Sequence, residues 1–138
     1  MRKVRDIMSA APACMAPGES VSAAARAMKR QGIGTVLVLT DGRLSGLVTD
    51  RDITVRVLAE NRDPRTTPIG DICSTDLVVI APDDDLAQAS RLVREHAVRR
   101  IPVLRDGIPV GVVSVGDLAL ESGATSVLPG MSSAPPND

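Results

Sequence analysis

An internal repeat constrains the fold of this 138-residue chain more than any other feature of its sequence. When the chain is shifted by 65 residues, the stretch 4–53 aligns with 69–118 without a gap, and 14 of the 50 pairs are identical. The identical pairs include turn residues, such as Asp41-Gly42 and Asp106-Gly107, and potential site residues, such as Asp52 and Asp117. We therefore expect two copies of one supersecondary unit that share a core.

Each copy is expected to begin with a short strand, at 13–16 in the first and 77–81 in the second, followed by a helix. Ser20 and Asp85 are the predicted N-caps of these helices. Four apolar positions are expected on one face of each helix. They are Val21, Ala24, Ala25 and Met28 in the first copy, and Leu86, Ala89, Leu92 and Val93 in the second.

A β-hairpin is predicted after each of these helices. Its strands are 36–40 and 46–49 in the first copy and 101–105 and 110–114 in the second, with an Asp-Gly turn between them. Second helices are expected at 50–59 and 115–121. The repeated order β-α-β-β-α predicts a mixed α/β (α+β) fold in which the two copies pack together.

The repeats are predicted to occupy 1–59 and 69–122, joined by a polar linker at 60–68 and followed by a mobile tail at 123–138. The N-terminal residues lack the apolar stretch of a signal peptide, and no segment is long and apolar enough to span a membrane. We expect a cytoplasmic protein without a membrane partner.

Composition excludes some partners. The chain contains no Phe, Trp or Tyr and has a formal net charge of -1, so it offers neither stacking platforms nor a large basic surface for nucleic acid. Cys14 and Cys73 have no second ligand at metal-binding spacing and are expected to be reduced thiols. His96 and the run 83–85 are interpreted as a solvated residue and a helix cap, and we expect no enzymatic activity.

The two points where a hairpin strand opens into a helix are the best candidates for a binding site. Thr49 and Ser114 lie there, and their hydroxyls can donate to a phosphate oxygen. Asp52 and Asp117 follow three residues later, where a carboxylate can accept both hydrogen bonds of a ribose diol. The same residues can equally form a plain N-terminal cap that binds nothing, and the sequence leaves the two interpretations open.

The repeats resemble the CBS motif family, whose paired motifs are also called Bateman modules. The opening residues 4–8 and the octapeptides 46–53 and 111–118 carry the resemblance, which covers 4–121 and is similar in layout to small bacterial proteins of two CBS motifs. It implies a pseudo-two-fold module in which the Thr or Ser and the Asp of each octapeptide contact a nucleotide. It also implies that Arg99 and Arg100, before Ile101-Pro102-Val103, flank the phosphates.

The second copy is better equipped for this role than the first. Its arginine pair precedes Pro102, which is expected to leave neighbouring backbone groups available to an adenine edge. The first copy has Thr35 in place of Arg100 and depends on Arg51 or Arg56 reaching in from the next helix. The predicted nucleotide-binding residues are Arg99, Arg100, Ile101, Pro102, Ser114, Asp117, Thr49, Asp52 and Thr35.

The resemblance implies a regulatory module that senses AMP, ADP, ATP or a related adenosyl ligand in the cleft between the motifs. No cofactor is required, and the nucleotide is a ligand. The alternative is a dimeric protein-interaction module whose nucleotide sites are vacant or vestigial. A homodimer and a regulated protein partner are expected in either case.

Overall fold

The computed structural model describes residues 2–121, so the tail predicted at 123–138 lies outside the described residues. Two three-stranded sheets carry the fold, in the orders β1-β6-β5 and β2-β3-β4. The strands are β1 (Ser9–Ala10), β2 (Cys14–Met15), β3 (Thr35–Thr40), β4 (Arg43–Thr49), β5 (Arg100–Arg105) and β6 (Ile108–Ser114). The expected α+β class is confirmed.

Helices follow the strands in both repeats. The α-helices are α1 (Val21–Gln31), α2 (Asp50–Ile53), α3 (Leu86–His96) and α4 (Val115–Glu121), with a π-helical stretch η2 (Thr54–Leu58) continuing α2. Single 3-10 turns, η1 (Val4–Asp6) and η3 (Ile69–Asp71), begin the two repeats. Within residues 2–121, none of these helices combines the length and apolar character needed to cross a bilayer.

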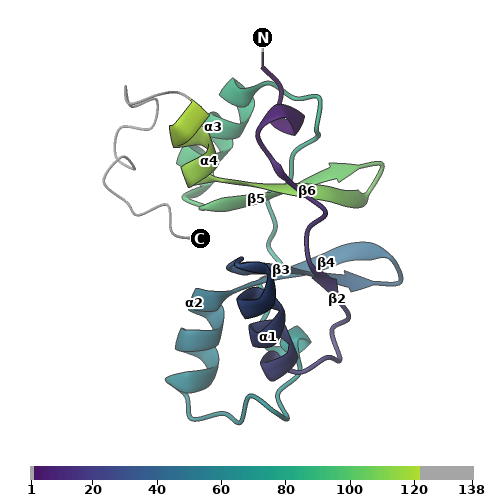
Figure 1. Cartoon of the computed structure of the whole chain (residues 1–138), viewed down its shortest axis with the longest axis vertical. Helices are drawn as coiled ribbons and strands as arrows, with labels where there is room; N and C mark the ends of the chain where they lie inside the picture. The colour runs from purple at the N-terminus through teal and green to yellow at the C-terminus, as the bar shows by residue number, and fades with distance from the viewer. Residues whose placement is uncertain (1, 122–138) are drawn as a thin grey trace. The chain divides into compact units, whose positions relative to one another are not determined.

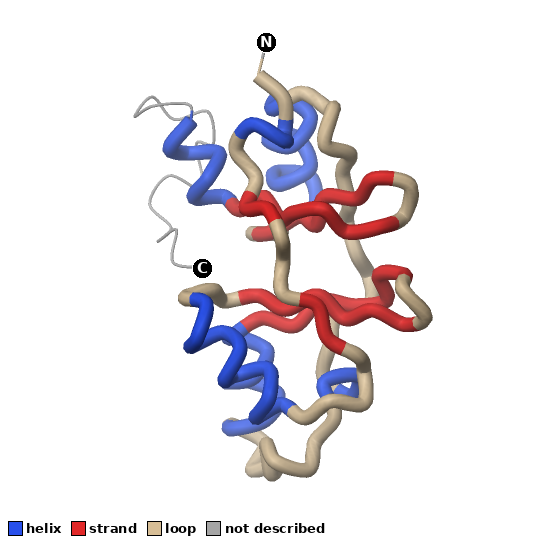
Figure 2. Tube along the Cα trace, turned by 45° about the vertical axis from the view of Figure 1, so that its right-hand side comes forward, coloured by secondary structure: helices blue, strands red, loops and turns tan. Residues whose placement is uncertain are grey.

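The chain divides into two compact units that do not coincide with the two sequence repeats. Residues 13–77 form one, the contiguous unit, whereas residues 2–12 and 78–121 together form the other, the split unit. In each unit the helices lie on one face of the sheet (Figures 1 and 2). The segment that opens each repeat therefore belongs to the unit that holds the hairpin of the other repeat.

Equivalent backbone hydrogen bonds hold these exchanged segments. In the split unit the N–H of Val4 donates to the carbonyl of Asp84, at 2.9 Å, and β1 pairs antiparallel with β6. In the contiguous unit the N–H of Ile69 donates to the carbonyl of Glu19, at 2.8 Å. Ser74 and Leu47 exchange N–H···O bonds of 2.9 and 3.0 Å there.

Each unit has its own aliphatic core, in keeping with the absence of aromatic residues. The split unit buries Val4, Ile80, Ala89, Val93, Ile101, Val103, Val113, Val115 and Leu118. The contiguous unit buries Val21, Ala24, Met28, Val36, Val38, Val48, Val57, Ile69 and Ile72. Val4 and Ile69, at equivalent repeat positions, are fully buried, so the exchanged segments are part of the cores.

Both hairpins form as predicted. Their Asp-Gly turns have positive φ at both residues, 53° and 79° at Asp41-Gly42 and 54° and 82° at Asp106-Gly107. This is the turn whose twist matches that of the flanking strands. The turn fixes the register, which pairs Thr35 with Thr49 and Arg100 with Ser114 at the open ends of the hairpins.

Three local predictions were wrong or incomplete. The strand expected at 77–81 is reduced to an isolated bridge between Ile80 and Val103. Ala25 is exposed and Ala27 is buried instead, so Val21, Ala24, Ala27 and Met28 form the buried stripe of α1. Asp85 takes the N-cap position of α3 without a side-chain cap, since its carboxylate pairs with Lys3 Nζ at 3.0 Å.

Candidate functional site

The hairpin register brings the predicted site residues together in two sets. Thr35, Thr49 and Asp52, called here the first junction, lie in the contiguous unit, where the N–H of Asp50 donates to the carbonyl of Gly34 at 3.0 Å. Arg100, Ser114 and Asp117, the second junction, lie in the split unit.

Each junction contains a reciprocal capping box. The N–H of Asp52 donates to Thr49 Oγ1 at 3.1 Å, and the N–H of Thr49 donates to Asp52 Oδ2 at 2.9 Å. The corresponding distances for Ser114 and Asp117 are 3.0 and 2.9 Å. The cap interpretation left open by the sequence is therefore correct at both junctions.

The cap does not use all of the polar capacity of these residues. It engages one oxygen, Oδ2, of each aspartate and one lone pair of each hydroxyl. The hydroxyl hydrogen can still donate, and a carboxylate has further lone pairs on its second oxygen. All four side chains are half-buried, so capping is compatible with a ligand contact.

In the first junction the second oxygen of the aspartate faces an arginine. Arg56 Nε lies 3.8 Å from Asp52 Oδ1, and Arg56 Nη1 donates to the carbonyl of Ile72 at 3.2 Å. Of the two arginines that the sequence offered as substitutes for Arg100, Arg56 therefore reaches Asp52. Arg56 was not among the predicted nucleotide-binding residues, although its i,i+4 spacing from Asp52 could have indicated the pair.

Thr35 is the second distinctive residue of the first junction. It is 9% exposed, and within residues 2–121 its Oγ1 is buried with no hydrogen-bond partner. Buried hydroxyls normally form a hydrogen bond, so a ligand or a water could supply the missing partner of Thr35 Oγ1.

At the second junction, the burial of residues 99–102 increases along the chain into β5. Arg99 and Arg100 are half-buried, whereas Ile101 and Pro102 are buried. The carbonyl of Arg99 accepts from Val115 N–H at 2.9 Å. The carbonyl of Pro102 itself accepts from Ile80 N–H at 3.1 Å, so this group is already used within the split unit.

The glycine of each octapeptide accommodates an exchanged segment. A Cβ built at Gly46 would lie 2.6 Å from Cys73 Sγ, and one built at Gly111 would lie 2.5 Å from Met8 Sδ. Met8 and Cys73 occupy equivalent repeat positions. The two glycines therefore have a packing role that supports the junctions, and sequence reasoning had not assigned it.

The remaining candidates were His96, the acidic run 83–85 and the two cysteines. His96 is exposed in the last turn of α3, and Asp84 Oδ2 accepts from Ala81 N–H at 3.0 Å while Asp83 pairs with Arg5. Partial burial raises the pKa of the Cys14 and Cys73 thiols.

Within residues 2–121, no group of three or more His, Cys, Asp or Glu side chains is arranged to hold a metal ion.

Comparisons with known proteins agree with this architecture. The CBS domain family matches residues 4–59 and 69–123. The chain is 38% identical to the CBS domain-containing protein YhcV of Bacillus subtilis, over 87% of this chain and 85% of that protein. It is 34% identical to Hypoxic response protein 1 of Mycobacterium tuberculosis, over 86% and 84% of the two chains.

A solved structure shares the fold as well. The crystal structure of Hypoxic Response Protein I with two coordinated zinc ions has a TM-score of 0.74 at 34% identity, covering 88% of this chain and 99% of that one. The resemblance drawn from the two octapeptides is thus confirmed. The chain belongs to the CBS domain family, as a pair of CBS motifs.

Proposed function

We propose that this CBS pair is a regulatory module that binds an adenine nucleotide, AMP, ADP, ATP or a related adenosyl ligand, chiefly at the second junction. The observation that carries the proposal is the adjacency of Arg100, Ser114 and Asp117, set by the β5–β6 register and the capping box. This set combines a cation for phosphate, a hydroxyl donor and a carboxylate acceptor for a ribose diol.

The first junction supports binding less strongly. Asp52 faces Arg56, so a ribose would have to compete with that guanidinium for Oδ1. The equivalent of Arg56 in the second repeat is Glu121, which cannot neutralise Asp117. The orphan Oγ1 of Thr35 nevertheless gives the first junction a polar atom that a ligand could satisfy, so we expect weaker binding there rather than none.

Adenine nucleotide is the ligand class that a relative makes relevant. The crystal structure of CBSX2 in complex with AMP matches this chain with a TM-score of 0.73 at 22% identity. At that identity the likeness concerns the fold, so the ligand proposal for this chain depends on its own junction residues.

Isothermal titration of the ligand-free protein with AMP, ADP and ATP tests the proposal. Asp117→Asn is the informative variant, because the amide oxygen can keep the cap to Ser114 N–H while the negative charge is lost. We expect it to weaken the tighter site by about tenfold or more, as for the loss of a charged hydrogen bond. Asp52→Asn, the matched variant of the other junction, should have a smaller effect.

Two outcomes would contradict the proposal. If none of the three nucleotides binds below millimolar concentration, the site is not a nucleotide site. If Asp52→Asn weakens the tighter site and Asp117→Asn does not, the assignment to the second junction is wrong. Thermal unfolding of both variants without ligand provides the control for folding.

The second candidate function is a dimeric interaction module, and exposed apolar residues favour it. Val55 and Leu58 on η2 are 44% and 59% exposed, and Leu120 on α4 is 84% exposed. Val55 and Leu120 are repeat equivalents, so both units present an apolar residue at the same place on the second helix. Such residues are candidates for a homodimer interface.

Light scattering of the purified protein tests this second candidate. We expect a dimer at micromolar concentration that Leu120→Asp or Leu58→Asp converts to a monomer. A monomeric parent protein would refute it. A rise in the unfolding midpoint with AMP would favour nucleotide sensing, since only a ligand of the folded state stabilises it.

A further inference from the structure

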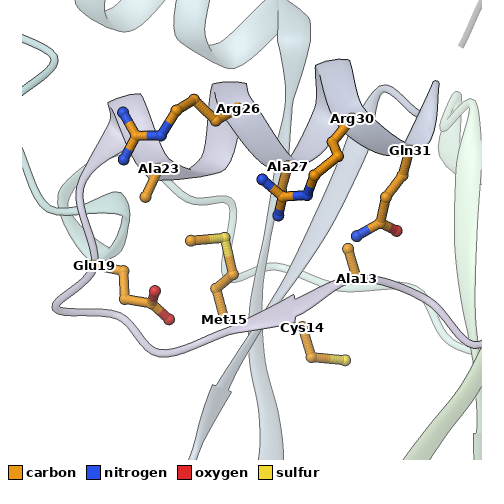
Figure 3. Close-up of a pocket in the computed structure, with 9 residues that line it drawn as sticks. All are labelled: Ala13, Cys14, Met15, Glu19, Ala23, Arg26, Ala27, Arg30 and Gln31. Atoms are coloured by element: carbon orange, nitrogen blue, oxygen red, sulfur yellow. The ribbon is translucent and has the colours of Figure 1, made fainter.

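A hollow in the contiguous unit is lined by none of the residues of the first junction. It has a volume of about 320 Å³ and is formed by α1 and the strand β2 with its flanking residues. In Figure 3 the side chains of Arg26 and Arg30 project from α1, and Met15 reaches from β2 toward the helix. The volume is at the lower end of the range for small-molecule pockets.

Two arginines, Arg26 and Arg30, and one acidic residue, Glu19, line this hollow, so positive charge is in excess. Arg26 and Arg30 are exposed and lie four residues apart on α1, where like charges repel. Within residues 2–121, neither guanidinium forms an ion pair or a hydrogen bond. Glu19, the acidic residue of the lining, already accepts from Ala16 N–H at 3.0 Å. An anion held by both guanidiniums would remove their repulsion.

Most of the remaining lining is small or apolar. Ala13, Ala23 and Ala27 leave room between helix and strand, and Gln31 adds an amide that can donate or accept. Two guanidiniums beside alanine methyls suit an anion with a short apolar body.

The second repeat provides an internal comparison. The equivalents of Ala27 and Arg30 there are Leu92 and Glu95. Leu92 is half-buried and packs against the core of the split unit, and Glu95 reverses the charge. These two differences remove the features that could hold an anion, so such a site belongs to the first repeat alone.

We propose that this hollow binds a small organic anion, a carboxylate or phosphate ester with a short apolar body, through Arg26 and Arg30. This site is distinct from the residues proposed to bind the nucleotide. It would give the module a second input of different chemistry.

Amide chemical shifts of the full chain, titrated with succinate and with inorganic phosphate at constant ionic strength, test the proposal. We expect saturable shifts at residues 13–15 and 26–31. Arg30→Glu, which introduces the residue of the second repeat, should weaken binding of both probes by about tenfold or more. Arg91→Gln, on the equivalent face of α3, is the matched control and should leave both affinities unchanged.

Ala27→Leu tests the apolar floor while keeping both arginines. It should weaken succinate more than phosphate, and Arg30→Glu covers the case in which the larger side chain disturbs α1. Sodium chloride that reproduces the shifts, or equal weakening by Arg91→Gln, would overturn the proposal. Retention of the shifts in Asp117→Asn, which targets the nucleotide junction, keeps this result separate from that proposal.

Discussion

The contiguous unit and the split unit contain the same hairpin and the same capping box, but they differ in what surrounds them. At the first junction Asp52 faces Arg56 and Thr35 lies at the strand start; at the second, Arg100 takes the place of Thr35 and the position of Arg56 is a glutamate. The repeat thus preserves the backbone scaffold, while charge differs at its edges. Two copies of one fold can therefore offer sites of different affinity.

The largest effect is expected from deleting the N-terminal segment that the split unit needs for its core and its sheet. Deleting residues 1–10 removes the buried Val4, Met8 and the strand β1, all of which belong to the split unit. We expect amide resonances of 78–121 to lose their dispersion while those of 13–77 keep it. Native dispersion throughout would show that the exchanged segment is dispensable.

The next largest difference is expected between Gly46→Ala and Gly111→Ala, which should destabilise the two units to different extents. Gly111→Ala brings Cβ to 2.8 Å from the carbonyl oxygen of Ser9, whereas at Gly46 the nearest backbone atom, the carbonyl oxygen of Ser74, is at 3.3 Å. We expect destabilisation of about 3 kcal/mol at Gly111 and about 1 to 2 kcal/mol at Gly46 in urea unfolding.

A second change at the facing sulfur residue sharpens this result. Cys73→Ala should rescue most of the cost of Gly46→Ala, because it removes the Sγ atom at 2.6 Å. Met8→Ala should not rescue Gly111→Ala, since the backbone contact remains. Equal rescue in both units would contradict the assigned contacts.

Substitutions at the N-caps of α1 and α3 should change the free energy of unfolding by smaller amounts. Ser20 Oγ accepts from Ala23 N–H at 3.1 Å, so Ser20→Ala should cost about 1 kcal/mol. Asp85 forms only a partly exposed pair with Lys3, so Asp85→Ala should cost less than about 0.5 kcal/mol and nothing in about 1 M salt. A larger loss for Asp85 would indicate a cap that forms in solution.

The helix ends should respond with opposite signs. The C-cap residue of α1 is Gly32, with φ 66°, and that of α3 is Ala97, with φ 53°. The left-handed conformation costs a residue with a Cβ about 1 kcal/mol. Thermal unfolding should therefore show that Ala97→Gly stabilises the split unit by somewhat under 1 kcal/mol and that Gly32→Ala destabilises the contiguous unit.

The smallest difference is expected between the reactivities of the two thiols, which both lie in the contiguous unit. Partial burial raises the pKa of each. A raised pKa lowers the thiolate fraction at pH 8, so both should alkylate a few-fold more slowly than an ordinary cysteine, with the rate rising as the pH increases. Cys14, which is exposed, should react before Cys73. Peptide mass spectrometry distinguishes them, and faster reaction of Cys73 would contradict its contact with Gly46.

Local features were predictable because local chemistry determines them. The Asp-Gly turns set the hairpins and hence the pairing of Thr35 with Thr49, and the spacing of Ser20 identified a cap. One of the four apolar positions predicted for α1 was wrong, because hydrophobicity alone does not distinguish Ala25 from Ala27.

Long-range features were not predictable in the same way. Nothing in the octapeptides indicates that Gly46 packs on Cys73, because the contact depends on which sheet each opening segment joins. Lys3 draws Asp85 away from capping for the same reason, since the two residues meet only in the split unit. The site residues Thr35, Thr49, Asp52, Arg99, Arg100, Ile101, Pro102, Ser114 and Asp117 remain predictions of binding.

The exchanged segments also set an order of events during synthesis of the chain. Every residue of the contiguous unit has been made once Leu77 is added, and its sheet can form at that point. The segment around Val4 is made first, yet β6, with which β1 pairs, ends at Ser114. The N-terminal segment therefore has no partner strand until the last hairpin has left the ribosome, and we expect the middle of the protein to fold before its start.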